Sequence, residues 1–362
     1  MDIKEYKCPN CSGAVKFDSS IQSMKCPYCD AEFEITALED YQKELAAAAE
    51  DRFDWDKGVD AESWDDPELD CLSTGSCPSC GAELIGDQNT IATVCPCCGN
   101  SQIVTRRLSG GLKPNFVIPF HLEKKAAIDA LKNFYHGKRL LPNCFNKENN
   151  IKSIQGVYVP FWLFDAETNA HIRYKATRTK VWSDTNYMYT KTDFYSVVRD
   201  GKMGFEKVPV DGSERMDNDY MDAIEPFDYK KIQDFQSGFL SGYLAEKYDV
   251  EAEQCKDRAG KRMKTSIERE FRKSVSGYNT VKVESSTVDV KGGKICYSLF
   301  PIWILNTKYK KENYQFIMNA ESGRLVGKLP ADPGKSWRYR ILFTGIIGIV
   351  STLIIQALAL FL

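Results

Sequence analysis

Eight cysteines near the start of the chain have the spacing of metal ligands. They fall into two groups, each made of two C-x2-C pairs that are fourteen residues apart: Cys8, Cys11, Cys26 and Cys29, then Cys77, Cys80, Cys95 and Cys98. Two thiolates in a tight turn can bind one metal ion, and a hairpin brings back the second pair to complete a tetrahedron. The pattern predicts two structural Zn2+ ions. Four thiolates close the coordination shell, so we expect no catalytic water on either ion.

Disulfides, rubredoxin-like iron and a redox-active dithiol are the alternative uses of such cysteines. Residues 1–7 lack the apolar run of a secretory signal, so we expect a reducing compartment. Paired C-x2-C spacings usually bind metal in that setting. Zinc is therefore the favoured interpretation for both groups.

Cys97 introduces an ambiguity, because it lies between Cys95 and Cys98 and could replace Cys98 as a ligand. We favour Cys98, since the Cys95 and Cys98 pair reproduces the spacing of the first group. Gly81 and Gly99 then follow the last thiolate of their pairs, where a glycine lets backbone N–H groups turn toward sulfur. Cys71 also lies beside the second group.

The region between the two cysteine groups is strongly acidic. The whole chain of 362 residues has a net charge of −2 and is 43% hydrophobic, enough for a core and for two or three domains. Residues 36–70, by contrast, carry thirteen acids and three bases. Residues 37–52 are predicted to form a short helix and the remainder a solvated linker. The competing interpretation is an acidic docking segment anchored by Phe53, Trp55 and Trp64.

The last 22 residues carry no charge. At about 1.5 Å per residue, a helix over residues 341–362 spans the roughly 30 Å of a bilayer's hydrocarbon core. Lys335, Arg338 and Arg340 precede it, with Trp337 and Tyr339 as interfacial aromatics, which favours a cytoplasmic N-terminal side. We expect a single-pass, tail-anchored protein of the cell membrane with its bulk in the cytoplasm.

The middle of the chain is predicted to be α+β with largely antiparallel sheet. Residues 159–165 and 300–306 are similar in sequence, with Trp162 aligned on Trp303, and residues 115–120 are a weaker third copy. We expect these segments to be core strands that begin at their prolines. Residues 156–180, 181–210, 281–290, 294–308 and 314–319 have strand character. Apolar spacing predicts helices over residues 228–248 and 250–275. The expected organisation is ribbon 1 (1–35), acidic helix and linker (36–74), ribbon 2 (75–107), one α+β domain or two related sheet units (108–334), and basic flank with transmembrane helix (335–362).

Motifs for catalysis are absent from the sequence. The three histidines, His121, His136 and His171, lie in no nucleophile or metal motif, and the chain has no GxxxxGK[ST] phosphate loop. We expect a protein that is not an enzyme. The remaining enzymatic possibility is a cleft in the middle region lined by Asp165, Glu167 or His171.

Several segments together resemble a known family of bacterial membrane proteins, the YdjG type, whose zinc ribbons are of the transcription-factor-IIB or replication-factor-Y kind. The segments that carry the likeness are the CPxC pairs and residues 156–162, 238–248, 300–303 and 319–330. The resemblance covers nearly the whole chain. It implies an adaptor found with flotillin-like (SPFH) or phage-shock-type membrane proteins and a related zinc-ribbon membrane protein.

Two functions follow from these observations. The first is a non-enzymatic, tail-anchored adaptor whose zinc-folded ribbons and α+β domain recruit cytoplasmic proteins. The alternative is nucleic-acid binding by the ribbons. Charge argues against it, since residues 1–35 carry −2 and residues 75–107 carry zero, whereas phosphate binding needs a basic face.

Overall fold

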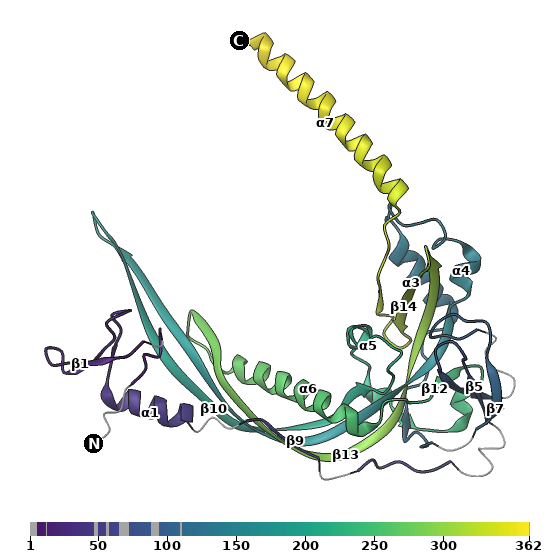
Figure 1. Cartoon of the computed structure of the whole chain (residues 1–362), viewed down its shortest axis with the longest axis horizontal. Coiled ribbons are helices and arrows are strands. Elements are labelled where there is room, and N and C mark those ends of the chain that lie inside the picture. The colour runs from purple at the N-terminus through teal and green to yellow at the C-terminus, as the bar shows by residue number, and fades with distance from the viewer. Residues whose placement is uncertain are drawn as a thin grey trace. The chain divides into compact units, whose positions relative to one another are not determined.

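The computed structural model describes residues 6–11, 13–46, 50–55, 58–64, 72–87, 94–108 and 111–361. These residues form two compact units, each assembled from three stretches of chain. Unit 1 contains residues 1–58, 164–208 and 256–294, and unit 2 contains residues 59–163, 209–255 and 295–362. Three long strands contribute to both units: β9 (Gln155–Ser183), β10 (Met188–Asp211) and β13 (Thr280–Tyr309), whose courses are visible in Figure 1.

The strands form a mixed but mostly antiparallel sheet, which confirms the α+β prediction. Among the described residues the main path is β11-β8-β13-β9-β12-β6-β5-β7, with β10 added beside β9 and β14 beside β13. Parallel pairs include β8 (Phe116–Val117) on β13, β12 (Leu244–Glu246) on β9, and β4 (Arg52–Asp54) on β13. β13 instead folds back antiparallel onto β14 (Glu312–Asn319) after a two-residue turn.

Unit 1 consists of the first ribbon, two helices and its share of the long strands. The ribbon is a three-stranded sheet of β1 (Lys16–Asp18), β2 (Ser23–Lys25) and β3 (Glu32–Phe33), followed by α1 (Ile35–Ala46). On β9, Arg173 lies against Tyr41 of α1, whereas Tyr174 donates to the Glu268 carbonyl of α6 (Ala252–Lys273). Because successive strand residues point to opposite faces, α1 and α6 cover opposite faces of the sheet.

The acidic segment is not a solvated linker in its described parts, so that prediction was wrong. The helix ends at Ala46, and residues 52–54 form β4 on the edge of β13. Trp55 packs edge-on against Phe164 in unit 1, and Trp64 packs in the same way against Phe235 in unit 2. The aromatic residues anchor the segment, but to the chain's own core. Residues 65–71, including Cys71, lie outside the described residues.

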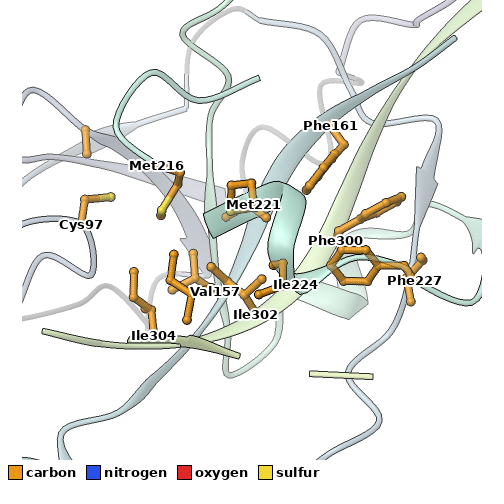
Figure 2. Packing of buried hydrophobic residues seen from close by; sticks show 14 of the residues in the cluster. Cys97, Val157, Phe161, Met216, Met221, Ile224, Phe227, Phe300, Ile302 and Ile304 are labelled. Atoms are coloured by element: carbon orange, nitrogen blue, oxygen red, sulfur yellow. The ribbon is translucent and has the colours of Figure 1, made fainter. Parts of the chain in front are cut away.

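Unit 2 has its main core between the sheet, α5 (Asn218–Ile224) and the second ribbon, which is built on β5 (Leu72–Ser76), β6 (Glu83–Asp87) and β7 (Val104–Arg107). Figure 2 shows Met221 and Ile224 of α5 beside Val157 and Ile302, with Cys97 at one end of the same cluster. Asp217 caps α5 by accepting from the Asp219 N–H, which satisfies a donor that the first turn leaves unpaired. The second ribbon therefore shares the core of the unit.

A second cluster of unit 2 lies under α3 (Lys124–Tyr135) and α4 (Glu148–Lys152), which place Leu131 and Ile151 against Phe316 and Met318 of β14. β14 is flanked by β15 (Leu325–Gly327), and Gly323 takes a φ of 76° in the turn between them. Only a residue without Cβ adopts that conformation readily.

The two echoed segments are core strands, as predicted, but their prolines are not strand starts. Pro160 and Pro301 lie inside strands of 29 and 30 residues. Trp162 and Trp303 are buried, and their indole N–H groups donate to the carbonyls of Val250 and Leu122. Each proline lacks an N–H donor, but its carbonyl still takes part in the backbone bonding: Gly212 donates to Pro160, and Ala320 to Pro301.

One predicted helix is wrong and the next is confirmed. Residues 228–248 form two single turns, η1 (Tyr229–Lys231) and η2 (Ser237–Leu240), and two short strands, β11 (Gln233–Asp234) and β12. Their backbone groups bond to neighbouring strands, as in β12 with Ile85 and Val157, and Gly242 has a φ of 80°. The helical spacing of apolar residues in 228–248 therefore arises because short turns and strands are buried one after another, and not because the segment is a helix. The following segment forms α6 as expected.

The chain ends in α7 (Pro333–Phe361), which is longer than the predicted span because its basic flank is also helical. Within residues 333–356 a window of 18 residues has a mean hydropathy of 1.6, and none of that window is buried in the protein. α7 is the one helix of the described residues that is long and apolar enough to cross a membrane.

Candidate metal centres

The first four cysteines come together in unit 1. The Sγ atoms of Cys8, Cys11, Cys26 and Cys29 all lie within 4.8 Å of one another. Cys8 and Cys29 are 3.6 Å apart at sulfur, and Cys11 and Cys26 are 3.5 Å apart. The first thiol of each pair is buried and the second is exposed, so the cluster lies at the surface of its ribbon.

The second four cysteines form an equivalent cluster in unit 2. The Sγ atoms of Cys77, Cys80, Cys95 and Cys98 also lie within 4.8 Å of one another. The sulfur atoms of Cys77 and Cys98, and those of Cys80 and Cys95, are 3.7 Å apart. The second thiol of each pair is here half-buried, so this cluster is more enclosed than the first.

Each C-x2-C pair closes the same backbone turn. The N–H of the first cysteine donates to the carbonyl five residues later: Cys8 to Gly13, Cys26 to Ala31, Cys77 to Ala82 and Cys95 to Asn100. Asp30 (54°), Gly81 (73°) and Gly99 (72°), each the residue after the second cysteine of its pair, have a positive φ. The role expected for the two glycines is thus present, and Asp30 takes the same conformation in ribbon 1.

The geometry of both clusters fits a zinc ion. Tetrahedral coordination with Zn–S bonds of about 2.3 Å places the sulfur atoms about 3.8 Å apart. The closest sulfur pairs of the two clusters, at 3.5–3.7 Å, are near this value without being bonded as disulfides. Four soft thiolates are the donor set that selects zinc or iron. When bound, such an ion would crosslink the two turns of its ribbon.

Backbone donors favour the thiolate form of one buried cysteine in each cluster. Burial alone would raise the pKa of Cys26, but the N–H groups of Tyr28 and Cys29 lower it to about 7. The pKa of Cys95 falls to about 4, chiefly because of the neighbouring Cys97 thiol, with help from the N–H groups of Cys98 and Cys97. The pKa values of Cys11, Cys29, Cys80 and Cys98 are raised instead, so Cys26 and Cys95 are the thiols most readily available in the metal-binding thiolate form.

Cys97 does not belong to the second cluster. Its thiol is buried and lies 3.7 Å from Oε1 of Glu246, on the core side of the ribbon. Glu246 is also buried and accepts a hydrogen bond of 2.9 Å from Ser213. The fold of ribbon 2 therefore brings Cys95 and Cys98 together with Cys77 and Cys80, while Cys97 packs into the core of unit 2.

The two ribbons differ in how they are held. Ribbon 1 has a core of only five buried residues, Cys8, Val15, Met24, Cys26 and Leu38. A single lysine of β9 holds its first turn: the Nζ atom of Lys175 donates to the carbonyls of Pro9 at 2.5 Å and Asn10 at 3.4 Å. Tyr41 of α1 adds a hydrogen bond of 2.6 Å to Glu284.

Ribbon 2 is held by several side chains from distant parts of unit 2. Arg215 donates to the Cys80 carbonyl at 2.8 Å and Gln315 to the Cys97 carbonyl at 3.3 Å, while Asn306 donates to the Pro96 carbonyl. Cys77 and Cys95 belong to the main hydrophobic core of the unit. Sequence reasoning missed these supporting residues, because isolated polar residues more than a hundred positions away carry no local signal.

A further surface that sequence reasoning missed is the tip of the β9–β10 hairpin. Trp182 stacks on Tyr189 with ring centroids 5.6 Å apart, although both rings are exposed. Tyr187 and Met188 are 67% and 77% exposed. Since large exposed apolar clusters usually mark interaction sites, this tip is a second candidate surface of unit 1.

Of the three residues proposed for an enzymatic cleft, two line one depression and the third does not. Asp165 and Glu167 line a surface depression of about 750 Å³ in unit 1, together with Lys291. The Asp165 carboxylate accepts from the Lys207 N–H at 2.7 Å. His171 is not among the lining residues and instead contacts Asp200, with Nδ1 and Oδ1 2.5 Å apart.

The fold and its sites define a class: α+β proteins with two four-cysteine clusters that fit zinc ribbons and one C-terminal helix apolar enough to cross a membrane. Over 348 residues the chain is 35% identical to the uncharacterized protein YdjG of Bacillus subtilis (strain 168), which covers 96% of this chain and 95% of that protein. The chain belongs to the YdjG family. No protein-family model matches it, and no solved structure matches it.

Proposed function

We propose that this protein is a non-enzymatic, tail-anchored membrane adaptor in which zinc-folded ribbon 1 recruits protein partners. The observation that carries the proposal is the difference in exposure between the two ribbons. Ribbon 1 presents Phe17, Ile21 and Tyr28 to solvent, with exposed fractions of 52%, 41% and 75%. A small module that exposes aromatic side chains around a closed metal centre has the character of a binding surface.

Ribbon 2 has a different part in this proposal. Its buried thiols pack with the sheet and α5, so its metal ion supports the fold of unit 2. Partner binding is thus assigned to ribbon 1 and, as a second surface, to the aromatic tip of the β9–β10 hairpin. Both surfaces belong to unit 1.

The membrane part of the proposal rests on α7. An exposed helix of this length and hydropathy loses its unfavourable contact with water when it enters a bilayer. Lys335, Arg338 and Arg340 at its N-terminal end favour the cytoplasmic side for the folded units. The partners proposed from the family resemblance are flotillin-like or phage-shock-type membrane proteins and a related zinc-ribbon membrane protein.

The test is affinity purification of the full chain from solubilised membranes, read by mass spectrometry. The double variant Phe17→Ser with Tyr28→Ser is expected to lose partners that the wild type retains, because it removes the exposed rings without touching a thiol. Val104→Ser is the control, because it removes an exposed apolar side chain, 50% exposed, outside both proposed binding surfaces. Chelation should reproduce the loss.

Two outcomes would contradict the proposal. If the ribbon variant and the chelated protein keep every partner, ribbon 1 does not recruit. If a carbonate wash releases the full-length chain from membranes, α7 is not an anchor. A chain that ends at residue 332 should be found in the soluble fraction.

A further inference from the structure

A cavity lined by basic residues lies at the start of α7, where the helix meets the loop that follows α3. It has a volume of about 460 Å³ and is lined by Arg139, Lys335, Arg338, Tyr339 and Leu342. The four helix residues are spaced at i, i+3, i+4 and i+7, so they form one face of α7. Arg139 faces them from the loop, and all five residues belong to unit 2.

Hydrogen bonds hold the loop and the helix together. Nζ of Lys335 donates to the Leu141 carbonyl at 2.6 Å and to Oδ1 of Asn143 at 2.7 Å. The N–H of Asp332 donates to the Leu140 carbonyl at 2.8 Å. The cavity is therefore bounded by segments that are fixed to each other before any ligand arrives, which lowers the entropic cost of binding.

The cations of the cavity have no ion-pair partner among the described residues, although the charge of the Asp332 carboxylate interacts with that of Lys335. Both acceptors of Lys335 are uncharged, and no carboxylate of the described residues forms an ion pair with Lys335, Arg139 or Arg338. Asp332 is the nearest acid in sequence, and its Oδ1 accepts from the N–H groups of Gly334 and Lys335. Three cations thus face a common space, which favours an anion with several oxygen atoms.

The other side of the cavity is apolar. Below Arg338 along α7, the lining passes to Tyr339 and then to Leu342, which is 56% exposed. A free phosphate ion would gain nothing from this apolar side. A ligand with a phosphate at one end and a hydrocarbon chain at the other would contact both parts.

We propose that Arg139, Lys335 and Arg338 form a binding site for the phosphodiester headgroup of an anionic membrane lipid, with its acyl chain along Tyr339 and Leu342. The inference rests on the proposed insertion of α7, which places its N-terminal end at headgroup level. The site binds one lipid at a defined position, in addition to the general attraction between basic flanks and anionic membranes.

The experiment is native mass spectrometry of the full chain in neutral detergent, titrated with phosphatidylglycerol or with phosphatidylcholine. One phosphatidylglycerol per chain is expected to be retained in preference to phosphatidylcholine. Arg139→Gln and Arg338→Gln should each weaken its binding roughly tenfold, since a charge-assisted hydrogen bond is lost. Arg340→Gln is the matched control, because it removes the same charge from the same helix outside the cavity and should change binding less than about twofold.

Each contrary result has a definite meaning. Equal weakening by Arg340→Gln would overturn the site in favour of diffuse attraction, and equal retention of phosphatidylcholine would overturn the selectivity for anionic lipid. Displacement of the lipid by millimolar inorganic phosphate would make free phosphate the ligand. All of these can occur while the chain stays in the membrane fraction, whereas loss from that fraction would refute the anchoring proposal.

Discussion

The ring of Phe53 lies directly on the bare Cα of Gly260. Phe53 comes from β4 in the acidic segment, and Gly260 lies within α6. A Cβ added at Gly260 would meet the base of the Phe53 ring at 2.9 Å, closer than side-chain carbons approach in proteins. The glycine therefore provides the space in which the acidic segment is anchored to unit 1.

Gly260→Ala is expected to destabilise the protein. Alanine improves helix propensity by about 1 kcal/mol, but overpacking at a buried contact costs about 1–3 kcal/mol, so a net loss of up to about 2 kcal/mol is predicted. Gly204→Ala is the control, because nothing lies within 4 Å of a Cβ there. Thermal unfolding in detergent measures both; a Gly260→Ala protein as stable as the wild type would refute the contact.

The two metal clusters should differ when one ligand is removed. Wild-type protein is expected to contain two zinc ions per chain, and Cys29→Ala and Cys98→Ala one each. Cys98→Ala should lower the unfolding temperature more, because ribbon 2 shares the core of unit 2 whereas ribbon 1 has its own small core. Metal analysis and thermal unfolding provide the two measurements.

Cys97→Ala is the control for that experiment. Its sulfur lies beside Glu246 and outside the cluster, so two ions per chain should remain. A chain with one ion after Cys97→Ala and two after Cys98→Ala would show that Cys97 is the ligand.

The buried Glu246 predicts a dependence of stability on pH. Burial raises the pKa of its carboxyl to about 7, although the hydroxyl of Ser213, the charge of Arg215 and the Cys97 thiol act in the opposite direction. The folded protein then binds more protons than the unfolded chain between about pH 4.5 and 7, so its stability falls as pH rises through this window, by at most about 3 kcal/mol.

Glu246→Gln removes this titration. The variant should gain unfolding temperature relative to the wild type as pH rises from 5 to 8, and the gain should level off above pH 7. Because the unfolding temperatures of the variant and the wild type are compared at the same pH, any effect of acid on the cysteine thiolates is the same in both and cancels. A difference that does not vary with pH would contradict the prediction.

Lys175 is expected to control how readily ribbon 1 loses its metal. Lys175→Met removes both hydrogen bonds to the turn at Pro9 and Asn10 but retains the aliphatic chain. Release of one of the two ions to a chromogenic chelator should become several-fold faster, while release of the other is unchanged. Lys191→Met in the hairpin is the control, and equal release rates for the two variants would count against the contact.

Some elements could be predicted from the sequence and others could not, and the difference lies in the range of the interactions. The charged helix α6 was predictable because its apolar face repeats at helical spacing over 22 residues. The same rule failed for residues 228–248, where backbone groups bond to strands distant in sequence, such as Ile85 and Val157. The acidic composition of residues 36–70 also led to the wrong prediction of a solvated linker. Three aromatic residues of this segment pack into the core despite its charge.

By itself the sequence determined which cysteines could gather and where a membrane helix could form, because both depend on spacing and hydropathy within a short stretch of chain. The tertiary structure decided what surrounds each cluster. The thiols of ribbon 2 are enclosed where Arg215, Asn306 and Gln315 arrive from other parts of unit 2, whereas ribbon 1 keeps Phe17 and Tyr28 exposed. Two identical spacings therefore become a core element and an exposed surface, since burial is fixed by contacts between residues far apart in the chain.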